Sequence, residues 1–396
     1  MKRYRLPYAE WSWAEYSGVL RAFFFGRNKA RGQAVALEAE LANLMGATSV
    51  YALNSGRAAL QIALRVFSKL RPDRSRVIVP SYVCPAVVES VLACGLVPLP
   101  VPVGTDLNLV LDEALNALDE TVLAIVVPHM YGCPAAIAAF EQLAQSRGVF
   151  LIDDAAQVVG ERQSGRMLGT FGDIGLISFA QSKCIVAGES GAGGVLICNN
   201  SKLKESVEAH IGQLQPANGR RRALFSFIWN YQLGNFPQHL SYYWIRLCGS
   251  ERKKLVPALI SNLDAVVARC QLRLLGERRQ ERLRVLGLYA QILEAEFSAM
   301  PISLPQYAPD RFLSRVVVVL PKQIDSVRLK RSMEAFGWGL RFGYPTYDVD
   351  INGRIRQACR NEVLELPLYS GMTYESVLDI CLRLIKYMNE NRFGEN

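Results

Sequence analysis

The chain has 396 residues, of which half are apolar and a fifth are charged, so it can bury a sizeable core and is not a disordered protein. Its length predicts a large domain accompanied by a smaller one. The net charge of +9 suits an anionic partner, whether a phosphorylated small molecule, a membrane surface or a nucleic acid, and charge alone does not distinguish among them.

The nine cysteines are an odd number and form no C-x-x-C pair, which indicates reduced thiols in the cytoplasm and argues against disulfides or a structural zinc. Glu10 and Glu15 interrupt the basic residues near the start, so we expect no secretory signal. The sequence has no run of about 18 uncharged, predominantly apolar residues, which argues against a membrane-spanning helix.

From residue 33 to about 200, short apolar runs alternate with stretches of helical period, which is the pattern of βα units that build a mostly parallel sheet. The continuous apolar character of the runs indicates burial on both faces, as in an α/β sheet covered by helices. The predicted strands are 50–53, 77–79, 96–101, 122–127, 149–152, 174–179 and 195–198, and the clearest predicted helices are 85–93 and 134–147.

Residues 214–256 are rich in aromatics and bracketed by basic clusters, so we interpret them as an insertion that covers the domain junction or a partner subunit rather than a membrane contact. The sequence beyond them predicts a long helical stretch at 261–297, a strand at 315–320, and helices at 325–336 and 373–388. This organisation divides the chain into a large domain, residues 1–255, and a smaller α+β domain, residues 256–396.

Two adjacent carboxylates follow the predicted strand at 149–152. Asp153 and Asp154 therefore lie at the carboxyl end of a buried strand, where doubly wound sheets bind their ligands. An aspartate at such a junction also commonly caps the next helix. We expect one of the two to be structural and the other functional.

Lys183 is the only lysine between Lys69 and Lys202, and it stands between an apolar run and a glycine-rich segment. An amine in apolar surroundings loses hydration, which favours its neutral, nucleophilic form and the formation of a Schiff base. The alternative is a lysine with a buried stem and a head that reaches solvent. From its surroundings alone, the two interpretations are equally supported.

A third feature is the segment Ser55-Gly56-Arg57, which follows a predicted strand and opens a predicted helix. Backbone N–H groups at such a helix start, together with the helix dipole, can hold a phosphate. The alternative is an ordinary N-cap, and the segment matches neither the Walker nor the Rossmann glycine pattern. An anion cradle, a carboxylate at a strand end and an isolated lysine are, however, the combination that pyridoxal phosphate needs.

The chain resembles the DegT/DnrJ/StrS sugar aminotransferases, a branch of the fold type I pyridoxal phosphate enzymes. The resemblance extends over most of the chain and is most specific at Ile152-Asp153-Asp154-Ala155-Ala156-Gln157, at the turn 169–173, and at Ser178-Phe179 with Lys183. It implies a large domain with a mostly parallel sheet and a smaller C-terminal domain. It also implies homodimers with sites at the subunit interface.

Carried over residue by residue, the resemblance implies Lys183 as the Schiff-base lysine and Asp154 as the partner of the pyridine nitrogen. It places Gln157 beside the ring hydroxyl, and Ser178 with Gly56 and Arg57 at the phosphate.

Three positions depart from the family pattern. Cys84 stands where an aromatic ring commonly stacks on the cofactor, which leaves Tyr82 as a possible substitute. The segment 257–261 replaces a phosphate-binding Asn-Tyr-Arg-Met-Ser segment, and Arg57 replaces a threonine. Because guanidinium groups bind phosphate bidentately, Arg57 is a candidate for restoring the lost phosphate affinity.

The resulting hypothesis is a transaminase that moves an amino group from glutamate to a keto sugar, carried on a nucleotide diphosphate, in amino-sugar or polysaccharide biosynthesis. The expected partners are these small molecules and a second copy of the chain, with no nucleic acid, no metal and no membrane. Aminotransfer to a keto cyclitol or another carbonyl compound is an alternative. A further alternative is a non-catalytic relative of the same fold.

Overall fold

The computed structural model describes residues 13–25, 31–180, 183–187, 193–217, 256–297, 314–321, 323–350, 352–359 and 361–391. The helices of the first half are α1 (Trp13–Phe25), α2 (Gly32–Met45), α3 (Gly56–Leu70), α4 (Pro85–Ala93), α5 (Leu111–Asn116), α6 (Ile137–Arg147) and α7 (Lys204–Gly212). Those of the second half are α10 (Asn262–Arg273), α11 (Leu275–Phe297), α12 (Ser326–Ala335) and α13 (Tyr374–Asn391). Short 3-10 helices lie at Met130–Gly132 and Ser201–Leu203.

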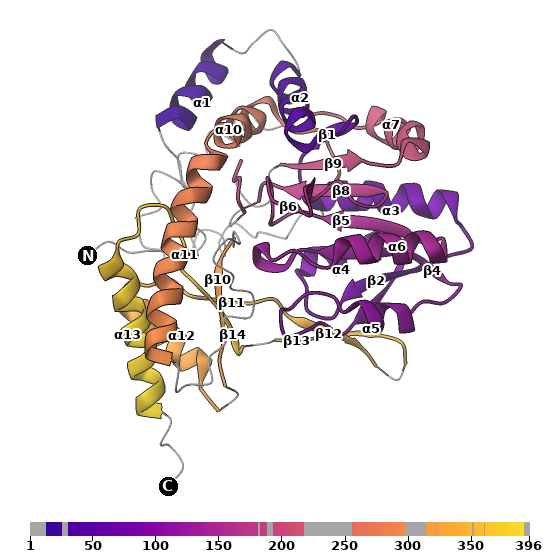
Figure 1. The fold of residues 1–396 in the computed structure, drawn as a ribbon. Helices are drawn as coiled ribbons and strands as arrows, with labels where there is room; N and C mark the ends of the chain where they lie inside the picture. Colours follow the sequence, from indigo (N-terminus) through magenta and orange to yellow (C-terminus); the bar gives the residue numbers. More distant parts are fainter. Residues whose placement is uncertain are drawn as a thin grey trace, which may run out of the picture.

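A seven-stranded sheet forms the centre of the large domain (Figure 1). Its spatial order is β1 (Val50–Leu53), β9 (Gly194–Cys198), β8 (Ile174–Ser178), β5 (Phe150–Asp154), β4 (Val122–Pro128), β2 (Arg76–Pro80) and β3 (Val97–Val101). Only β9 runs antiparallel to its neighbours. Each of the seven predicted strands is present, and the mostly parallel α/β fold is confirmed.

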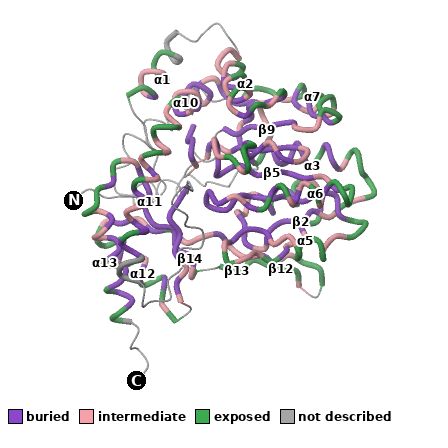
Figure 2. Tube along the Cα trace, in the orientation of Figure 1, coloured by how far each residue is buried: buried purple, intermediate pink, exposed green. Residues whose placement is uncertain are grey.

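Helices cover both faces of this sheet, so its strands are buried on both sides (Figure 2). On one face α2, α6 and α10 pack against alternate strand residues, and on the other α3, α4 and α7 do so. In β4, for example, Ile125 and Val127 face the first layer of helices, whereas Leu123 and Val126 face the second. This two-sided burial explains why the strands read as nearly unbroken apolar runs in the sequence.

The C-terminal part surrounds a separate core, which extends from Val285 in α11 to Met388 in α13. Its three-stranded sheet has the order β10 (Val316–Val319), β14 (Val363–Leu366) and β11 (Arg341–Phe342), and α11, α12 and α13 lie beside it (Figure 1). The remaining strands form two hairpins. One pairs β6 (Arg162–Gln163) with β7 (Arg166–Met167), and the other pairs β12 (Thr346–Val349) with β13 (Ile355–Ala358).

The predicted helical stretch at 261–297 is two helices, α10 and α11, which are separated at Leu274. Residues of α10 such as Ala265 and Ala268 pack in the core of the large domain, not in the C-terminal core. The division at residue 256 remains a prediction, and this packing favours a boundary at the start of α11. Of the predicted insertion at 214–256, residues 218–255 lie outside the described part of the chain.

Candidate active site

The predicted site residues follow the carboxyl ends of three strands of the central sheet. Ser55 follows β1, Asp154 ends β5 and Ser178 ends β8, with Lys183 shortly beyond. Because β1, β5 and β8 run in the same direction, these residues meet at one edge of the sheet.

Asp153 is the structural member of the aspartate pair. Its fully buried carboxylate accepts hydrogen bonds from Gly169 N (2.6 Å) and Phe171 N (3.0 Å), and it lies 2.8 Å from His129 Nε2. Since His129 Nδ1 accepts from Ala135 N (3.0 Å), the imidazole proton is on Nε2 and is donated to Asp153. Asp153 therefore holds the turn that leads into β8. It does not cap a helix, which was the structural role considered from the sequence.

Asp154 is the member whose carboxylate is open to a ligand. Its Oδ1 accepts a hydrogen bond from Ala156 N (3.0 Å), whereas Oδ2 has no hydrogen-bond partner among the described residues. Burial raises the pKa of the Asp154 carboxyl, and the nearby Lys183 ammonium opposes this rise. A buried carboxylate with one free oxygen is suited to accept a hydrogen bond from a protonated ring nitrogen.

Lys183 is half-buried and is near enough to this carboxylate to interact with it electrostatically. Its backbone N–H donates to Ala180 O (3.2 Å), and the next residue, Cys184, is buried with its thiol donating to Gln157 O (3.3 Å). The first bond closes a turn within the lysine segment, and the second ties that segment to the loop after β5. The electrostatic contact with Asp154 favours the functional interpretation of Lys183 over a side chain that simply reaches bulk water.

The start of α3 touches the end of β8. A Cβ atom on Gly56 would lie 2.9 Å from the Cβ of Ser178, so only a glycine allows this approach without a shift. Ser55 Oγ accepts a hydrogen bond from Ala58 N (3.0 Å), which is the N-cap role named above as the alternative. The backbone N–H of Arg57 has no partner within the described ranges and, with the Ser178 hydroxyl, forms a small anion cradle.

The Arg57 side chain lies at the margin of this cradle. Its guanidinium group pairs with Glu89 of α4 at 3.4 Å, and the two side chains are 39% and 48% exposed. A pair this exposed is weak, so the guanidinium can exchange Glu89 for a phosphate at little cost.

Gln157 is buried, with 5% of its surface exposed, and its amide is held at one end only. The hydroxyl of Ser314, which precedes β10, donates to Gln157 Oε1 at 3.3 Å. The other end of the amide, Nε2, has no hydrogen-bond partner in the part of the chain that the structure describes. Sequence reasoning did not identify Ser314, since a contact across 157 residues leaves no local pattern.

Tyr82 is placed differently from the stacking role considered for it. Its side chain is fully buried, and its hydroxyl lies 2.7 Å from Tyr131 Oη and accepts from Tyr344 N (2.9 Å). A ring that stacks on a cofactor is accessible when the protein is without it, and Tyr82 is not. The structure therefore assigns Tyr82 to a tyrosine cluster at the domain junction, with the half-buried Cys84 packed against the cluster.

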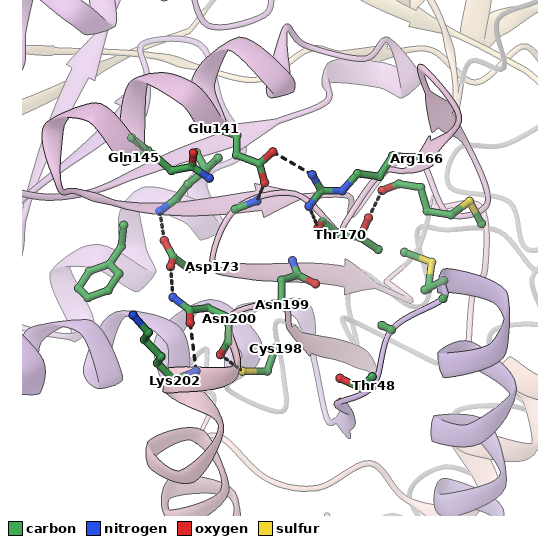
Figure 3. A pocket seen from close by; sticks show the side chains of 18 of the residues that line it. Thr48, Glu141, Gln145, Arg166, Thr170, Asp173, Cys198, Asn199, Asn200 and Lys202 are labelled. Carbon is green, nitrogen blue, oxygen red and sulfur yellow. Dashed lines mark hydrogen bonds and ion pairs between the residues drawn. The ribbon is translucent and has the colours of Figure 1, made fainter.

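A wide concavity of about 1320 Å³ lies at the opposite edge of the sheet, away from these residues (Figure 3). Three of its charged groups already have partners: Arg166 pairs with Glu141 (2.8 Å), and Asp173 accepts from Asn200 Nδ2 (2.7 Å) and Leu151 N (2.9 Å). It contains none of the predicted site residues. Its size alone therefore does not make it the reaction site.

Within the described ranges, no group of three or more His, Cys, Asp and Glu side chains is arranged to hold a metal ion. No helix in the described part of the chain is both long enough and apolar enough to cross a membrane.

Residues 26–384 match the model of the DegT/DnrJ/EryC1/StrS aminotransferase family. Among curated proteins, the chain is 35% identical over 176 residues to UDP-N-acetyl-3-dehydro-alpha-D-glucosamine 3-aminotransferase of Acidithiobacillus ferrooxidans, a match that covers 44% of this chain and 47% of that protein. It is 26% identical over 350 residues to dTDP-4-dehydro-2,3,6-trideoxy-D-glucose 4-aminotransferase of Saccharopolyspora spinosa, which covers 85% and 84% of the two chains. In the first of these matches, the chain spans about half of the relative's length.

Among solved structures, Helicobacter pylori PseC, an aminotransferase involved in the biosynthesis of pseudoaminic acid, superposes with a TM-score of 0.76. The alignment covers 98% of this chain and all of that one, at 17% identity. It confirms the predicted fold.

Proposed function

Because the chain belongs to the DegT/DnrJ/EryC1/StrS aminotransferase family, we propose that it transfers an amino group from glutamate to a keto sugar, with pyridoxal phosphate as its cofactor. The observation that carries this proposal is that Lys183 lies within electrostatic reach of the buried carboxylate of Asp154, at the sheet edge where the α3 cradle also lies. Two sugar aminotransferases among the relatives support the substrate class.

The open donors and acceptors at this edge support a fit between these residues and the cofactor. Among the described residues, the unpartnered oxygen of Asp154 suits a pyridinium N–H, and the unpartnered Nε2 of Gln157 suits a ring oxygen. The Arg57 N–H and the Ser178 hydroxyl suit a phosphate. The amine of Lys183 is then the group that bonds to the aldehyde. Ser55 supports the cradle by capping α3 rather than by direct contact.

When bound, pyridoxal phosphate supplies an electron sink that stabilises negative charge at the reacting carbon of the substrate. Asp154 keeps the ring nitrogen protonated, because an ionised carboxylate next to it favours the charged form. Lys183 would hold the cofactor through its amine, and the same amine, when not bonded to the cofactor, would take the proton from the glutamate Cα. In the second half-reaction, Lys183 returns a proton at the carbon that receives the nitrogen.

The preferred acceptor is a keto sugar on a nucleotide diphosphate. Its phosphates suit a chain of net charge +9, and the two curated relatives described above are named for nucleotide-linked sugars. The keto cyclitol alternative has no comparable support from the charge. A non-catalytic relative would have no need of Lys183, Asp154, Gln157 and Ser178 together.

Incubation of the purified protein with glutamate, pyridoxal phosphate and a panel of nucleotide-linked keto sugars tests the proposal. We expect 2-oxoglutarate to form with at least one nucleotide-linked sugar and not with the free sugar or a keto cyclitol. Failure of the protein to bind pyridoxal phosphate at all would refute the proposal, whereas turnover of the cyclitol alone would redirect it.

We further propose a cytoplasmic homodimer in which each site is completed by the other subunit. The described part of the cradle offers few phosphate donors, so a neighbouring subunit is a natural source of more. The eight cysteines in the described ranges are all free thiols, which suits a reducing compartment. Light scattering during size exclusion is expected to give about twice the mass of one chain, and a monomer that is fully active would contradict the proposal.

Arg57→Thr is expected to weaken cofactor binding about tenfold, because a charged hydrogen bond to phosphate contributes about 1.5–3 kcal/mol and this one is partly exposed. Glu89→Gln is the matched control, and it is expected to strengthen cofactor binding because it frees the Arg57 guanidinium group from its present partner. The dissociation constant of pyridoxal phosphate, measured by fluorescence titration of the apoprotein, should rise in the first variant and fall in the second. Equal affinity in both variants and the wild type would show that Arg57 does not bind the phosphate.

A further inference from the structure

Ser314, at the start of the C-terminal domain, forms a hydrogen bond through its hydroxyl with Gln157 of the proposed cofactor site. Ser314 is 4% exposed, its Oγ donates to Gln157 Oε1 (3.3 Å), and its backbone N–H donates to Tyr131 O (2.7 Å). We infer that Ser314 is a positioning residue that turns the Gln157 amide so that its N–H donor faces the ring oxygen of the cofactor. This inference rests on the proposed function, since it concerns the same site.

The two ends of the Gln157 amide have opposite effects on that ring oxygen. An amide carries an acceptor oxygen at one end and a donor NH₂ at the other, and Ser314 engages the acceptor. The NH₂ group is left to donate, and a donor stabilises the anionic form of a ring hydroxyl. If the amide were reversed, its carbonyl oxygen would repel that anion.

The position of Ser314 is fixed on both sides. Tyr131, which accepts its N–H, has a left-handed backbone (φ 57°) and is held by the Tyr82 hydroxyl and by stacking on Tyr344 at 5.5 Å. On the other side, Arg315 forms an ion pair with Glu365 of β14, with the two side chains only 5% and 1% exposed. The serine therefore cannot shift far without disturbing a buried ion pair or the tyrosine cluster.

The consequence is a link between the domains at the chemical site. Asp154, Gln157 and Lys183 all belong to the large domain, whereas Ser314 belongs to the segment that enters the small domain. The seating of β10 against the large domain thus supplies the hydroxyl that holds the oxygen end of this amide.

The test is a pH titration of the visible absorbance of the protein carrying covalently bound pyridoxal phosphate. In Ser314→Ala the amide can reverse, so the midpoint of the titration is expected to rise by about 0.5 to 1 pH unit, the equivalent of one hydrogen bond. Ser314→Thr keeps the hydroxyl and should restore the wild-type midpoint. In a Gln157→Ala background, Ser314→Ala should produce no further shift.

The double-variant comparison distinguishes positioning from general damage. A shift of equal size with and without Gln157 would overturn the inference, because Ser314 would then not act through the amide. An unchanged midpoint in Ser314→Ala would also overturn it, while covalent cofactor in that variant would leave the proposed function intact. Absence of cofactor absorbance in the wild-type protein would refute the proposed function, and the inference with it.

Discussion

Lys183→Ala is expected to abolish transamination, with a loss of turnover on the order of 10⁴-fold or more, the range found when a covalent catalytic group is removed. The variant loses both the amine that bonds the cofactor and the base that moves the substrate proton. It should also release pyridoxal phosphate on gel filtration, whereas the wild-type protein should retain it. Single-turnover formation of 2-oxoglutarate and the visible absorbance spectrum measure the two effects.

Lys202→Ala is the matched control, because Lys202 is the next lysine in the chain, is exposed, and lies at the opposite edge of the sheet. Its activity and its absorbance should equal those of the wild-type protein. Full activity in Lys183→Ala would remove the basis of the proposed chemistry, and an equal loss in Lys202→Ala would attribute the effect to a general loss of positive charge.

Asp154→Asn is expected to lower turnover on the order of 10³-fold, as removal of one preorganised electrostatic group does. The amide keeps the size of the carboxylate and its bond from Ala156 N, but it no longer favours a protonated ring nitrogen. Cofactor binding through Lys183 should persist, so the loss should appear in turnover rather than in retention. Near-normal turnover would exclude Asp154 as the partner of the ring nitrogen.

Asp154→Asn is expected to lower turnover but to raise the stability of the apoprotein at neutral pH. Burial raises the folded-state pKa of Asp154 above its ordinary value of 3.8, so the unfolded state ionises first as pH rises. The free energy of unfolding of the wild-type protein therefore falls, relative to that of Asp154→Asn, as pH rises from about 3.8 through the folded pKa. Urea denaturation should show equal stabilities in acid and a more stable variant at neutral pH.

Asp153→Asn serves as the comparison, because it should lower the free energy of unfolding where Asp154→Asn raises it. It replaces a carboxylate oxygen that accepts two backbone N–H bonds, so we expect a loss of about 1–3 kcal/mol of stability. A stability gain in Asp153→Asn, or a stability loss in Asp154→Asn at neutral pH, would contradict the division of roles between the two aspartates.

The central sheet could be predicted from the sequence because its strands are buried on both faces and therefore appear as apolar runs. The position of the Asp153–Asp154 pair followed from the same pattern, since ligands bind at the carboxyl ends of such strands. Lys183 was singled out by its isolation in apolar surroundings, and Ser178 by the family resemblance alone. The choice between Asp153 and Asp154 required the structure, because only hydrogen-bond partners distant in sequence distinguish them.

Other features were beyond sequence reasoning for identifiable physical reasons. Tyr82 was considered for ring stacking, but its surroundings depend on Tyr131 and Tyr344, which come from other parts of the chain. The hairpin of β12 and β13 is short and largely exposed, so its strands lack the apolar signal of the central sheet. The break between α10 and α11 falls at Leu274, and the nearest glycine, Gly276, lies inside the first turn of α11 rather than at the break.

Asp153 and Asp154 are adjacent in β5, and successive side chains of a strand point to opposite faces of the sheet. The strand's alignment with β4 and β8 thus decides which carboxylate meets the cofactor and which anchors the turn. A displacement of β5 by a single residue would leave a carboxylate at only one of these two positions and would place Ile152 or Ala155 at the other. Deletions or duplications within this strand should accordingly be harmful even when both acidic residues survive.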